Sequence, residues 1–296
     1  MINTLLIILE QSLLHLPLMF GAYISFSLLK VPDLSIETAY VVGTIMGSSV
    51  LTSIPSLPPG SVIIMVIAAA IFGGAIVGLT SSIFTQKGKL PHLLSSIITF
   101  GLFHGINQLI SPVYVSLSTT CNPIALLDYI QQHPELPMLA IISCIITVGI
   151  YCLFKTQIGY SCAVYGNNPQ FFRNYGISTS FVFITGIMLA NASAGISGYL
   201  CAQSNNFLEL NMGLGKALLC ITALVLGKGI MHLKKPFSFL IPLVGTVAYF
   251  TLQQLLLKVG FNLKYFTAAQ AVLVLCILIY TYRKQPHRPV NDNLGV

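Results

Sequence analysis

Long apolar runs dominate this sequence and restrict its fold more than any other feature. A helix needs roughly 20 apolar residues to cross about 30 Å of hydrocarbon. The candidate spans are residues 4–29, 36–53, 61–85, 91–111, 137–155, 181–203, 212–231, 237–257 and 265–282. Some long runs have room for a re-entrant break, so we expect an all-α polytopic transmembrane bundle of about eight to ten spans.

The composition supports a membrane protein. Of 296 residues, 55% are hydrophobic and only 7% are charged, whereas soluble domains carry roughly 25% charged residues. No polar stretch is long enough for a second domain, so residues 1–296 are expected to form a single transmembrane domain. The first run has no Lys or Arg before it and contains Glu10, which favours an uncleaved span over a signal peptide.

The basic residues predict the orientation. The net charge of +7 comes from 14 Lys and Arg against 7 Asp and Glu, and we attribute it to cytoplasmic loops rather than to nucleic-acid binding. Basic residues follow alternate spans: Lys87, Lys89, Lys155, Arg173, Lys228, Lys234, Lys235, Arg283, Lys284 and Arg288. This places the 156–180 loop and the C-terminal tail, residues 283–296, in the cytoplasm. The exception is 258–264, with Lys258 and Lys264.

Two spans carry small residues at every fourth position. One stripe is Gly186, Ala190, Ala194 and Gly198, and the other is Ala70, Gly74 and Gly78. Membrane helices approach one another closely over such faces. We expect packing within the chain rather than a dimer seam.

A short polar segment, YGNNPQFFRNYGI at residues 165–177, interrupts the apolar pattern. Asn168 is suited to cap a helix, Pro169 to its first position and Gly176 to its left-handed end. A helix of this length is not stable alone. It therefore rests either on lipid headgroups or against a cytoplasmic partner, and the pattern leaves both open.

Two further polar stretches lie among the spans. Residues 30–40, KVPDLSIETAY, hold Asp33 and Glu37, which face a cavity at a helix break or are solvated in a short turn. On the later helix, Asn191, Ser193 and Gln203 favour hydrogen bonds to a neighbouring helix over pathway lining.

The sequence carries no visible catalytic or metal-binding pattern. His15 and His104 lack metal-ligand spacing, and no phosphate-binding G-x-x-x-x-G-K-[ST] or G-x-S-x-G motif is present. We interpret the seven Cys as small buried hydrophobes. We therefore expect neither enzymatic activity nor a cofactor on this chain, and no metal site.

Three segments together resemble a known family: residues 28–47, 159–203 and 206–230. They are similar to the permease subunits of ABC transporters of the branched-chain amino acid and ribose class. The similarity is closest to the branch paired with lipoprotein-type binding proteins and associated with tryptophan or other aromatic amino acids. The GxN-P-x(6)-GI loop that begins at Gly166 is its most specific element.

The resemblance implies roles for particular residues. The loop would be the coupling element that docks on the ATPase, through Gly166, Asn167, Asn168, Pro169, Phe172, Arg173, Gly176 and Ile177. Residues 32–35 would lie near the translocation pathway, for which the candidates are Asp33, Ser35, Glu37, Tyr40, Asn191 and Gln203. The chain departs from the family pattern at Ala163, Thr38 and Lys228, which leaves the charges of the ATPase contact open.

The resemblance also implies a type II importer-like permease of the bacterial inner membrane that works by alternating access. Its partners would be an ATPase subunit that binds ATP and Mg²⁺, a second permease copy forming a homodimer, an extracytoplasmic binding protein and the surrounding lipid. The alternative is an ion-coupled secondary transporter of a small polar solute, for which the VGT shared by residues 39–47 and 242–249 is thin support. A membrane-embedded enzyme is disfavoured.

Overall fold

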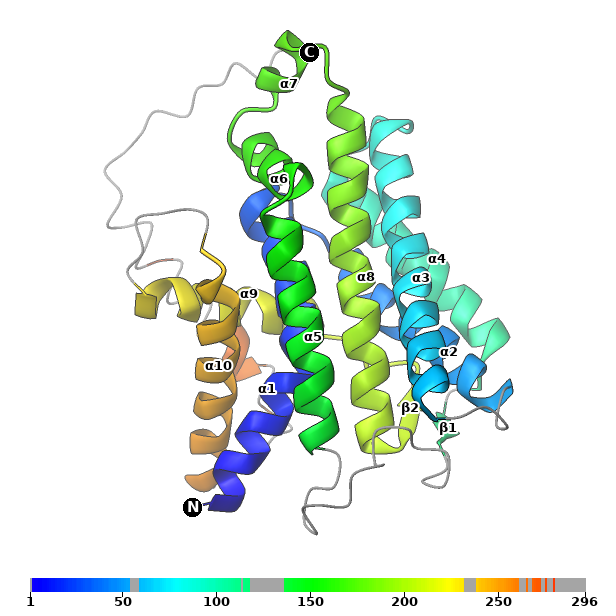
Figure 1. The fold of residues 1–296 in the computed structure, drawn as a ribbon, viewed down its shortest axis with the longest axis vertical. Helices are drawn as coiled ribbons and strands as arrows, with labels where there is room; N and C mark the ends of the chain where they lie inside the picture. The colour runs from blue at the N-terminus through cyan, green and yellow to red at the C-terminus, as the bar shows by residue number, and fades with distance from the viewer. Residues whose placement is uncertain are drawn as a thin grey trace.

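The long helices of the computed structural model lie side by side in one bundle (Figure 1). The structure describes residues 2–53, 59–112, 114–117, 136–231, 238–260, 265, 268–272, 275 and 279. The helices are α1 (Ile2–Ala22) with a π-helical extension η1 (Tyr23–Leu28), α2 (Ser35–Ser53), α3 (Pro59–Gln86), α4 (His92–Ile110), α5 (Leu136–Phe154), α6 (Gln157–Asn167), α7 (Gln170–Asn174), α8 (Thr179–Asn205), α9 (Lys216–Met231) and α10 (Leu240–Lys258).

The expected helical polytopic fold is confirmed. Within the described residues, six helical segments are long and apolar enough to cross a membrane: Asn3–Leu28, Gly60–Gln86, His92–Ile110, Leu136–Phe154, Thr179–Asn205 and Leu240–Lys258. The predicted spans at 36–53 and 212–231 form α2 and α9, which fall short of that criterion. Most of the predicted span at 265–282 lies outside the described residues.

Pro17 lies inside α1 and removes one of its hydrogen-bond donors. The carbonyl of Leu13, four residues earlier, instead accepts from Ser143 Oγ of α5 at 3.0 Å. The next carbonyl, of Leu14, accepts from Ser197 Oγ of α8 at 2.7 Å. Because no water is present in hydrocarbon to satisfy these groups, the two serines tie α1 to α5 and α8 at the proline.

Helix α8 is the most buried of the six segments and packs against α1, α2 and α3. Glycine makes this packing possible, since a Cβ on Gly198 would clash with the carbonyl oxygen of Tyr40 in α2. A Cβ on Gly195 would meet the carbonyl oxygen of Ala70 in α3. The stripe Gly186, Ala190, Ala194 and Gly198 therefore faces helices of the same chain.

A pair of three-residue strands, which the sequence analysis did not anticipate, joins two loops. Strand β1 (Tyr114–Ser116) pairs antiparallel with β2 (Phe207–Glu209), with Val115 opposite Leu208. These strands lie at the end of the bundle where α8 finishes (Figure 1). Pairing satisfies the backbone groups of two connections that hydrophobicity alone leaves as loops.

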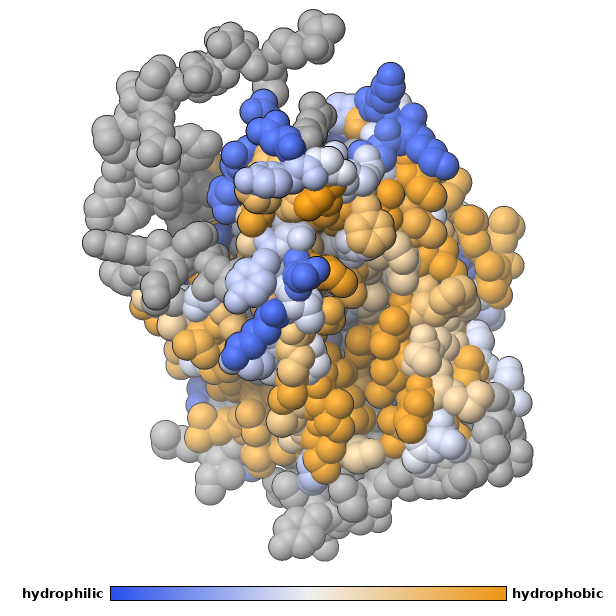
Figure 2. Space-filling model, turned by 45° about the horizontal axis from the view of Figure 1, so that its top comes forward, coloured by the Kyte–Doolittle hydropathy of each residue, from blue (hydrophilic) through white to orange (hydrophobic). Residues whose placement is uncertain are grey.

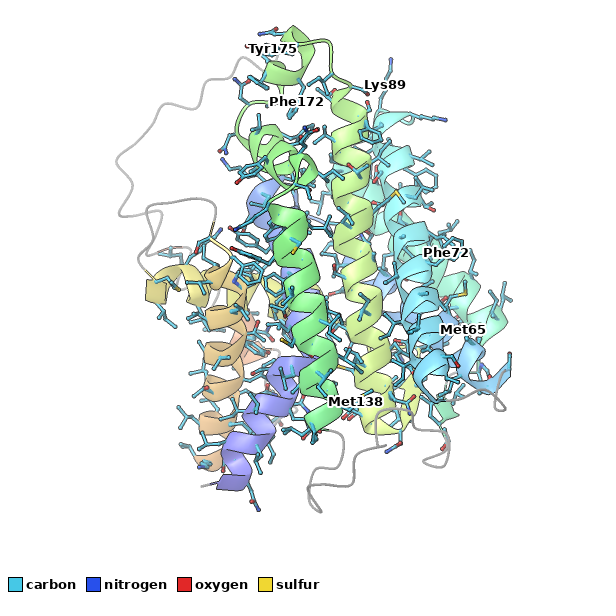
Figure 3. The ribbon with its side chains drawn as sticks, in the orientation of Figure 1. Met65, Phe72, Lys89, Met138, Phe172 and Tyr175 are labelled. Atoms are coloured by element: carbon cyan, nitrogen blue, oxygen red, sulfur yellow. The ribbon has the colours of Figure 1, made fainter. Side chains whose placement is uncertain are left out.

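Polarity divides the surface of the bundle. Hydrophobic residues cover its flank, and hydrophilic residues gather toward the end that carries α7 (Figure 2). The α3–α4 turn lies at the same end, as the positions of Lys89, Phe172 and Tyr175 show, whereas Met138 lies at the opposite end (Figure 3). The loop with Lys87 and Lys89 and the 156–180 loop, which were predicted to share a side of the membrane, therefore lie at the same end of the bundle. The predicted cytoplasmic tail, residues 283–296, lies outside the described residues.

Candidate functional site

Helix α2 begins inside the bundle, after an irregular segment at residues 29–34. Asp33 in this segment is fully buried. One carboxylate oxygen, Oδ1, accepts from the Ser35 N–H at 2.9 Å and from Ser35 Oγ at 2.6 Å. The other, Oδ2, accepts from Asn191 Nδ2 of α8 at 2.9 Å. Asp33 thus closes the first turn of α2 and joins that helix to α8.

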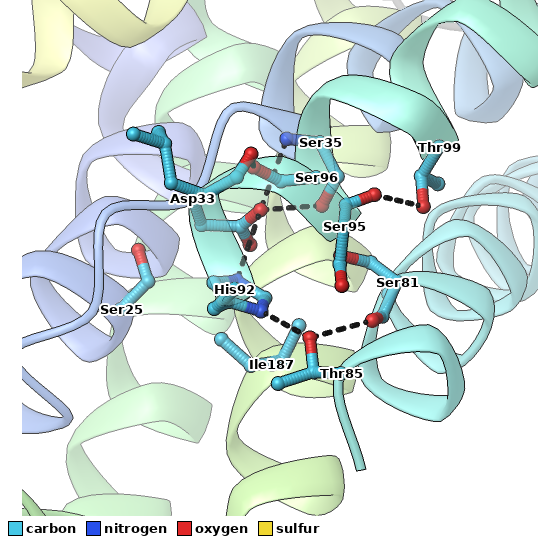
Figure 4. Close-up of polar contacts among 12 residues, drawn as sticks. Ser25, Asp33, Ser35, Ser81, Thr85, His92, Ser95, Ser96, Thr99 and Ile187 are labelled. Atoms are coloured by element: carbon cyan, nitrogen blue, oxygen red, sulfur yellow. Dashed lines mark hydrogen bonds and ion pairs between the residues drawn. The ribbon is translucent and has the colours of Figure 1, made fainter. Parts of the chain in front are cut away.

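His92, the first residue of α4, completes the cluster. Its Nε2 lies 3.6 Å from Asp33 Oδ1, and its Nδ1 lies 2.9 Å from Thr85 Oγ1 of α3 (Figure 4). The Phe183 ring of α8 packs edge-on against the imidazole, with ring centroids 5.2 Å apart. Residues of α2, α4 and α8 therefore converge on one buried carboxylate, and α3 joins them through His92. Three of the predicted pathway residues, Asp33, Ser35 and Asn191, are brought together here, and all three are fully buried.

The second acid of the segment, Glu37, has a different position and partner. Its Oε1 accepts from the Ala217 N–H at 3.1 Å, at the first turn of α9. A carboxylate satisfies the free N–H groups of a helix start and complements its dipole. Asp33 and Glu37 therefore serve the starts of two different helices.

Lys216, the first residue of α9, lies beside His15 of α1. Its Nζ is 2.9 Å from His15 Nε2 and 5.0 Å from the centroid of the Tyr40 ring. Both Lys216 and His15 line an open pocket of about 250 Å³ between α1, α9 and α10.

The remaining predicted pathway residue, Gln203, lies near the end of α8. It is fully buried and its Oε1 accepts from the Tyr199 hydroxyl at 3.0 Å. Of the predicted pathway set, Tyr40 contacts the pocket wall through Lys216, whose Nζ lies 5.0 Å from the centroid of the Tyr40 ring.

The predicted coupling segment forms α6, α7 and the turn after them. Gly176 has φ +68°, and the Ile177 N–H donates to the Phe172 carbonyl at 2.9 Å. This is the 6→1 hydrogen bond of a Schellman motif. Asn168 ends α6, and its backbone carbonyl accepts from the Phe171 N–H. The side-chain cap expected for Asn168 is therefore replaced by a backbone contact.

The start of the coupling segment is packed directly onto the break before α2. A Cβ on Gly166 would clash with the carbonyl oxygen of Leu28, the last residue of η1. Lys30 Nζ donates to Asn167 Oδ1 at 2.6 Å. The α6–α7 segment therefore contacts the same irregular stretch that carries Asp33.

The aromatic residues of α7 and of the turn after it divide into buried and exposed ones. Phe172 is only 3% exposed, whereas Phe171 is 41% and Tyr175, directly after α7, is 70% exposed. Phe172 thus anchors α7 to its own chain, and Phe171 and Tyr175 present the exposed apolar surface; Figure 3 shows Tyr175 at this end of the bundle. The side chain of Arg173 lies outside the described part of the structure.

The sequence analysis missed His92, Lys216 and the pocket role of His15. His15 had been noted only as lacking a metal-ligand spacing. A lysine next to an apolar run is an available signal, because ionisable groups at membrane depth are costly and usually functional. Among the residues that the structure describes, no three His, Cys, Asp or Glu side chains gather as a metal-binding group.

Comparison with known proteins assigns the family. Residues 5–280 match the family described as the permease component of the branched-chain amino acid transport system. The chain belongs to this family. It is accordingly a multi-pass permease of the bacterial inner membrane, of the kind that serves ATP-binding cassette importers of small solutes. The resemblance carried by the three sequence segments is confirmed.

The permease has several curated relatives. It is 28% identical to an uncharacterised protein of Rickettsia prowazekii, over 88% of this chain and 91% of the relative. It is 28% identical to the tyrosine transport system permease protein of Clostridioides difficile, over 79% of this chain and 75% of that protein. The galactofuranose transporter permease protein of Escherichia coli is 24% identical, over 80% and 70% respectively. No solved structure matches the permease.

Proposed function

We propose that this permease imports an aromatic amino acid, driven by ATP that a separate ATPase subunit hydrolyses. The observation that carries the substrate class is the similarity to a tyrosine transport permease over 79% of the chain. The sugar and autoinducer permeases among the relatives are matched at lower identity or over less of the chain. An extracytoplasmic binding protein would deliver the solute.

Helix α7 is the proposed contact with the ATPase. It lies at the hydrophilic end of the bundle, together with the Lys87–Lys89 turn, and exposes Phe171 and Tyr175 there. Exposed aromatic residues surrounded by polar surface are typical anchors of protein interfaces. Gly166 and Asn167 connect this contact to the break before α2. Movement of α7 is therefore transmitted to the start of α2 without an intervening flexible linker.

The mechanism we propose is alternating access in a pair of permease copies. Closure of two ATPase subunits around ATP would draw two α7 helices together, and the bundles would open toward one side at a time. The match of residues 5–280 to the permease family supports the ATP-driven mechanism over the alternative of an ion-coupled carrier.

The coupling assignment is tested with purified components. Tyr175→Ala is expected to weaken ATPase binding about 5- to 30-fold, which corresponds to about 1–2 kcal/mol for an aromatic anchor. Tyr265→Ala is the matched control, because Tyr265 is also exposed, at 61%, and lies outside the coupling segment. Equal ATPase affinity of the two variants refutes the role of α7.

The substrate is tested in proteoliposomes that contain the permease, its ATPase and its binding protein. ATP-dependent uptake of tyrosine, phenylalanine or tryptophan is expected. Uptake of a sugar with no uptake of these amino acids overturns the substrate class but leaves the importer intact. Uptake that follows an ion gradient and ignores ATP overturns the proposal as a whole.

A further inference from the structure

The pocket between α1, α9 and α10 has an unusual lining for a membrane domain. It holds the cation of Lys216, the imidazole of His15 and the amide side chains of Gln11, Gln253 and Gln270, with the aromatic rings of Tyr249 and Phe250 beside them. His15 occupies the middle of the first span, Asn3–Leu28. The polar lining therefore lies at membrane depth, where polar groups are retained chiefly for function.

The hydrogen bonds of His15 establish which group carries charge. Its Nδ1 lies 3.0 Å from the Gln11 carbonyl oxygen, which only accepts, so Nδ1 carries the proton. Its Nε2 therefore presents a lone pair to the Lys216 ammonium 2.9 Å away. The imidazole is neutral in this arrangement, and Lys216 is the positive group of the pair.

Lys216 has no counter-ion in the described part of the chain. No carboxylate oxygen of a described residue lies within 4.0 Å of its Nζ. Glu37, which lies at the same helix start, is engaged with the Ala217 N–H. One donor of the ammonium is directed to His15, and Tyr40 lies beneath the charge at 5.0 Å. An ammonium with free donors at the wall of an open pocket is a receptor for an anion.

We propose that Lys216 binds the carboxylate of the transported solute, with His15 as a positioning residue that holds the ammonium at the pocket wall. The pocket has a volume of about 250 Å³ and is open on one side, so a small solute can reach the ammonium. Its amide side chains supply acceptors and donors for the rest of the solute, and the Tyr249 and Phe250 rings supply an apolar face. This inference rests on the proposed function and adds the chemical group that the permease itself recognises.

The wild-type protein provides the first test. The permease alone, in lipid nanodiscs, is titrated with radiolabelled L-tyrosine in competition with two analogues. Hydroxyphenylpropionate keeps the carboxylate and lacks the amine, whereas tyramine keeps the amine and lacks the carboxylate. We expect hydroxyphenylpropionate to compete at least tenfold more strongly than tyramine. Equal competition, stronger competition by tyramine, or binding of none of the three ligands overturns the site.

Substitutions provide the second test. Lys216→Met is expected to weaken tyrosine binding about 10- to 100-fold, the loss expected for one charge-assisted hydrogen bond, and to leave tyramine competition unchanged. Lys216→Arg keeps the charge and should retain most of the preference. Lys258→Met, at the end of α10 and outside the pocket, is the matched control. The ratio of tyrosine affinity to tyramine affinity, measured in one sample, does not depend on how much of a variant folds. Equal ratios in the Lys216→Met and Lys258→Met variants overturn the proposal.

The readouts also separate this site from the proposed function. If the complete transporter shows no ATP-dependent uptake of aromatic amino acids, the proposed substrate class is wrong. If the isolated permease shows no preference for a carboxylate, only the assignment of the Lys216 pocket is wrong.

Discussion

Replacing Asp33 by alanine tests the central polar cluster most directly. The change removes the acceptor for the Ser35 N–H and for one N–H of Asn191. Ser35 Oγ keeps an alternative acceptor, since it lies 3.2 Å from Asn191 Oδ1. The other Asn191 N–H keeps the Ile187 carbonyl at 3.0 Å. Two buried donors are therefore left without a partner.

The expected cost follows from that count. A buried donor without an acceptor costs about 1–3 kcal/mol, whereas bonds between membrane helices average only about 0.6 kcal/mol in mutant cycles. The Asp33→Ala variant should therefore lose about 1–6 kcal/mol of unfolding free energy. Ser35→Ala removes only the hydroxyl bond and should cost about 0.5–1.5 kcal/mol.

The assay is equilibrium unfolding of the purified permease in mixed micelles with increasing sodium dodecyl sulfate. Glu209→Ala is the matched control, since Glu209 lies in β2, away from the cluster. We expect the order of destabilisation Asp33→Ala, then Ser35→Ala, then Glu209→Ala. An Asp33→Ala variant as stable as the Glu209→Ala control refutes the argument that this carboxylate holds α2 and α8 together.

Three other predictions concern the packing, the coupling segment and the start of α9. Gly198→Ala should lower the free energy of unfolding by about 1–3 kcal/mol, because the added methyl group overpacks against the Tyr40 carbonyl. Gly105→Ala, with no atom within 4 Å of an added Cβ, should be neutral or stabilising in the same unfolding assay. Equal stability of the two variants contradicts the close packing. Gly166→Ala should push α6 away from the Leu28 carbonyl and lower solute-stimulated ATPase activity severalfold while the ATPase still co-purifies; normal stimulation argues against transmission through this contact. Glu37→Ala should destabilise the permease by about 0.5–2 kcal/mol because the Ala217 N–H loses its acceptor, and Glu37→Gln, which keeps an acceptor oxygen, should lose less; equal losses would show that the charge rather than the hydrogen bond matters.

Much of the fold was predictable because it depends on local properties. The predicted span at 91–111 corresponds to α4 (His92–Ile110), and the one at 137–155 to α5 (Leu136–Phe154). Both follow from the length of an apolar run matched to the thickness of hydrocarbon. The left-handed end of α7 at Gly176 is likewise local, because only glycine adopts that conformation without a steric cost.

The site was only partly predictable. Asp33 and Ser35 are two residues apart, so their contact is local. Asn191 reaches Asp33 from 158 residues away, and Lys216 reaches His15 from 201 residues away. Nothing in the neighbourhood of either residue in the sequence specifies such a partner. The five-residue α7 is also too short for a hydrophobic period, so the sequence does not reveal that Phe172 points inward and Phe171 outward.

The amino-acid sequence by itself determined a membrane-embedded helical bundle, most of its long helices to within a few residues, the short polar segment at 165–177 and, through its resemblance, the permease family. Hydrophobic length and turn chemistry act over a few residues and can be read in order along the chain. The tertiary structure alone decided that Asp33 is buried among α2, α4 and α8, that Glu37 serves the start of α9, and that Lys216 faces an open pocket with no counter-ion among the described residues. Those outcomes depend on which helices pack closely at their glycine residues. Contacts between segments far apart in sequence set that packing.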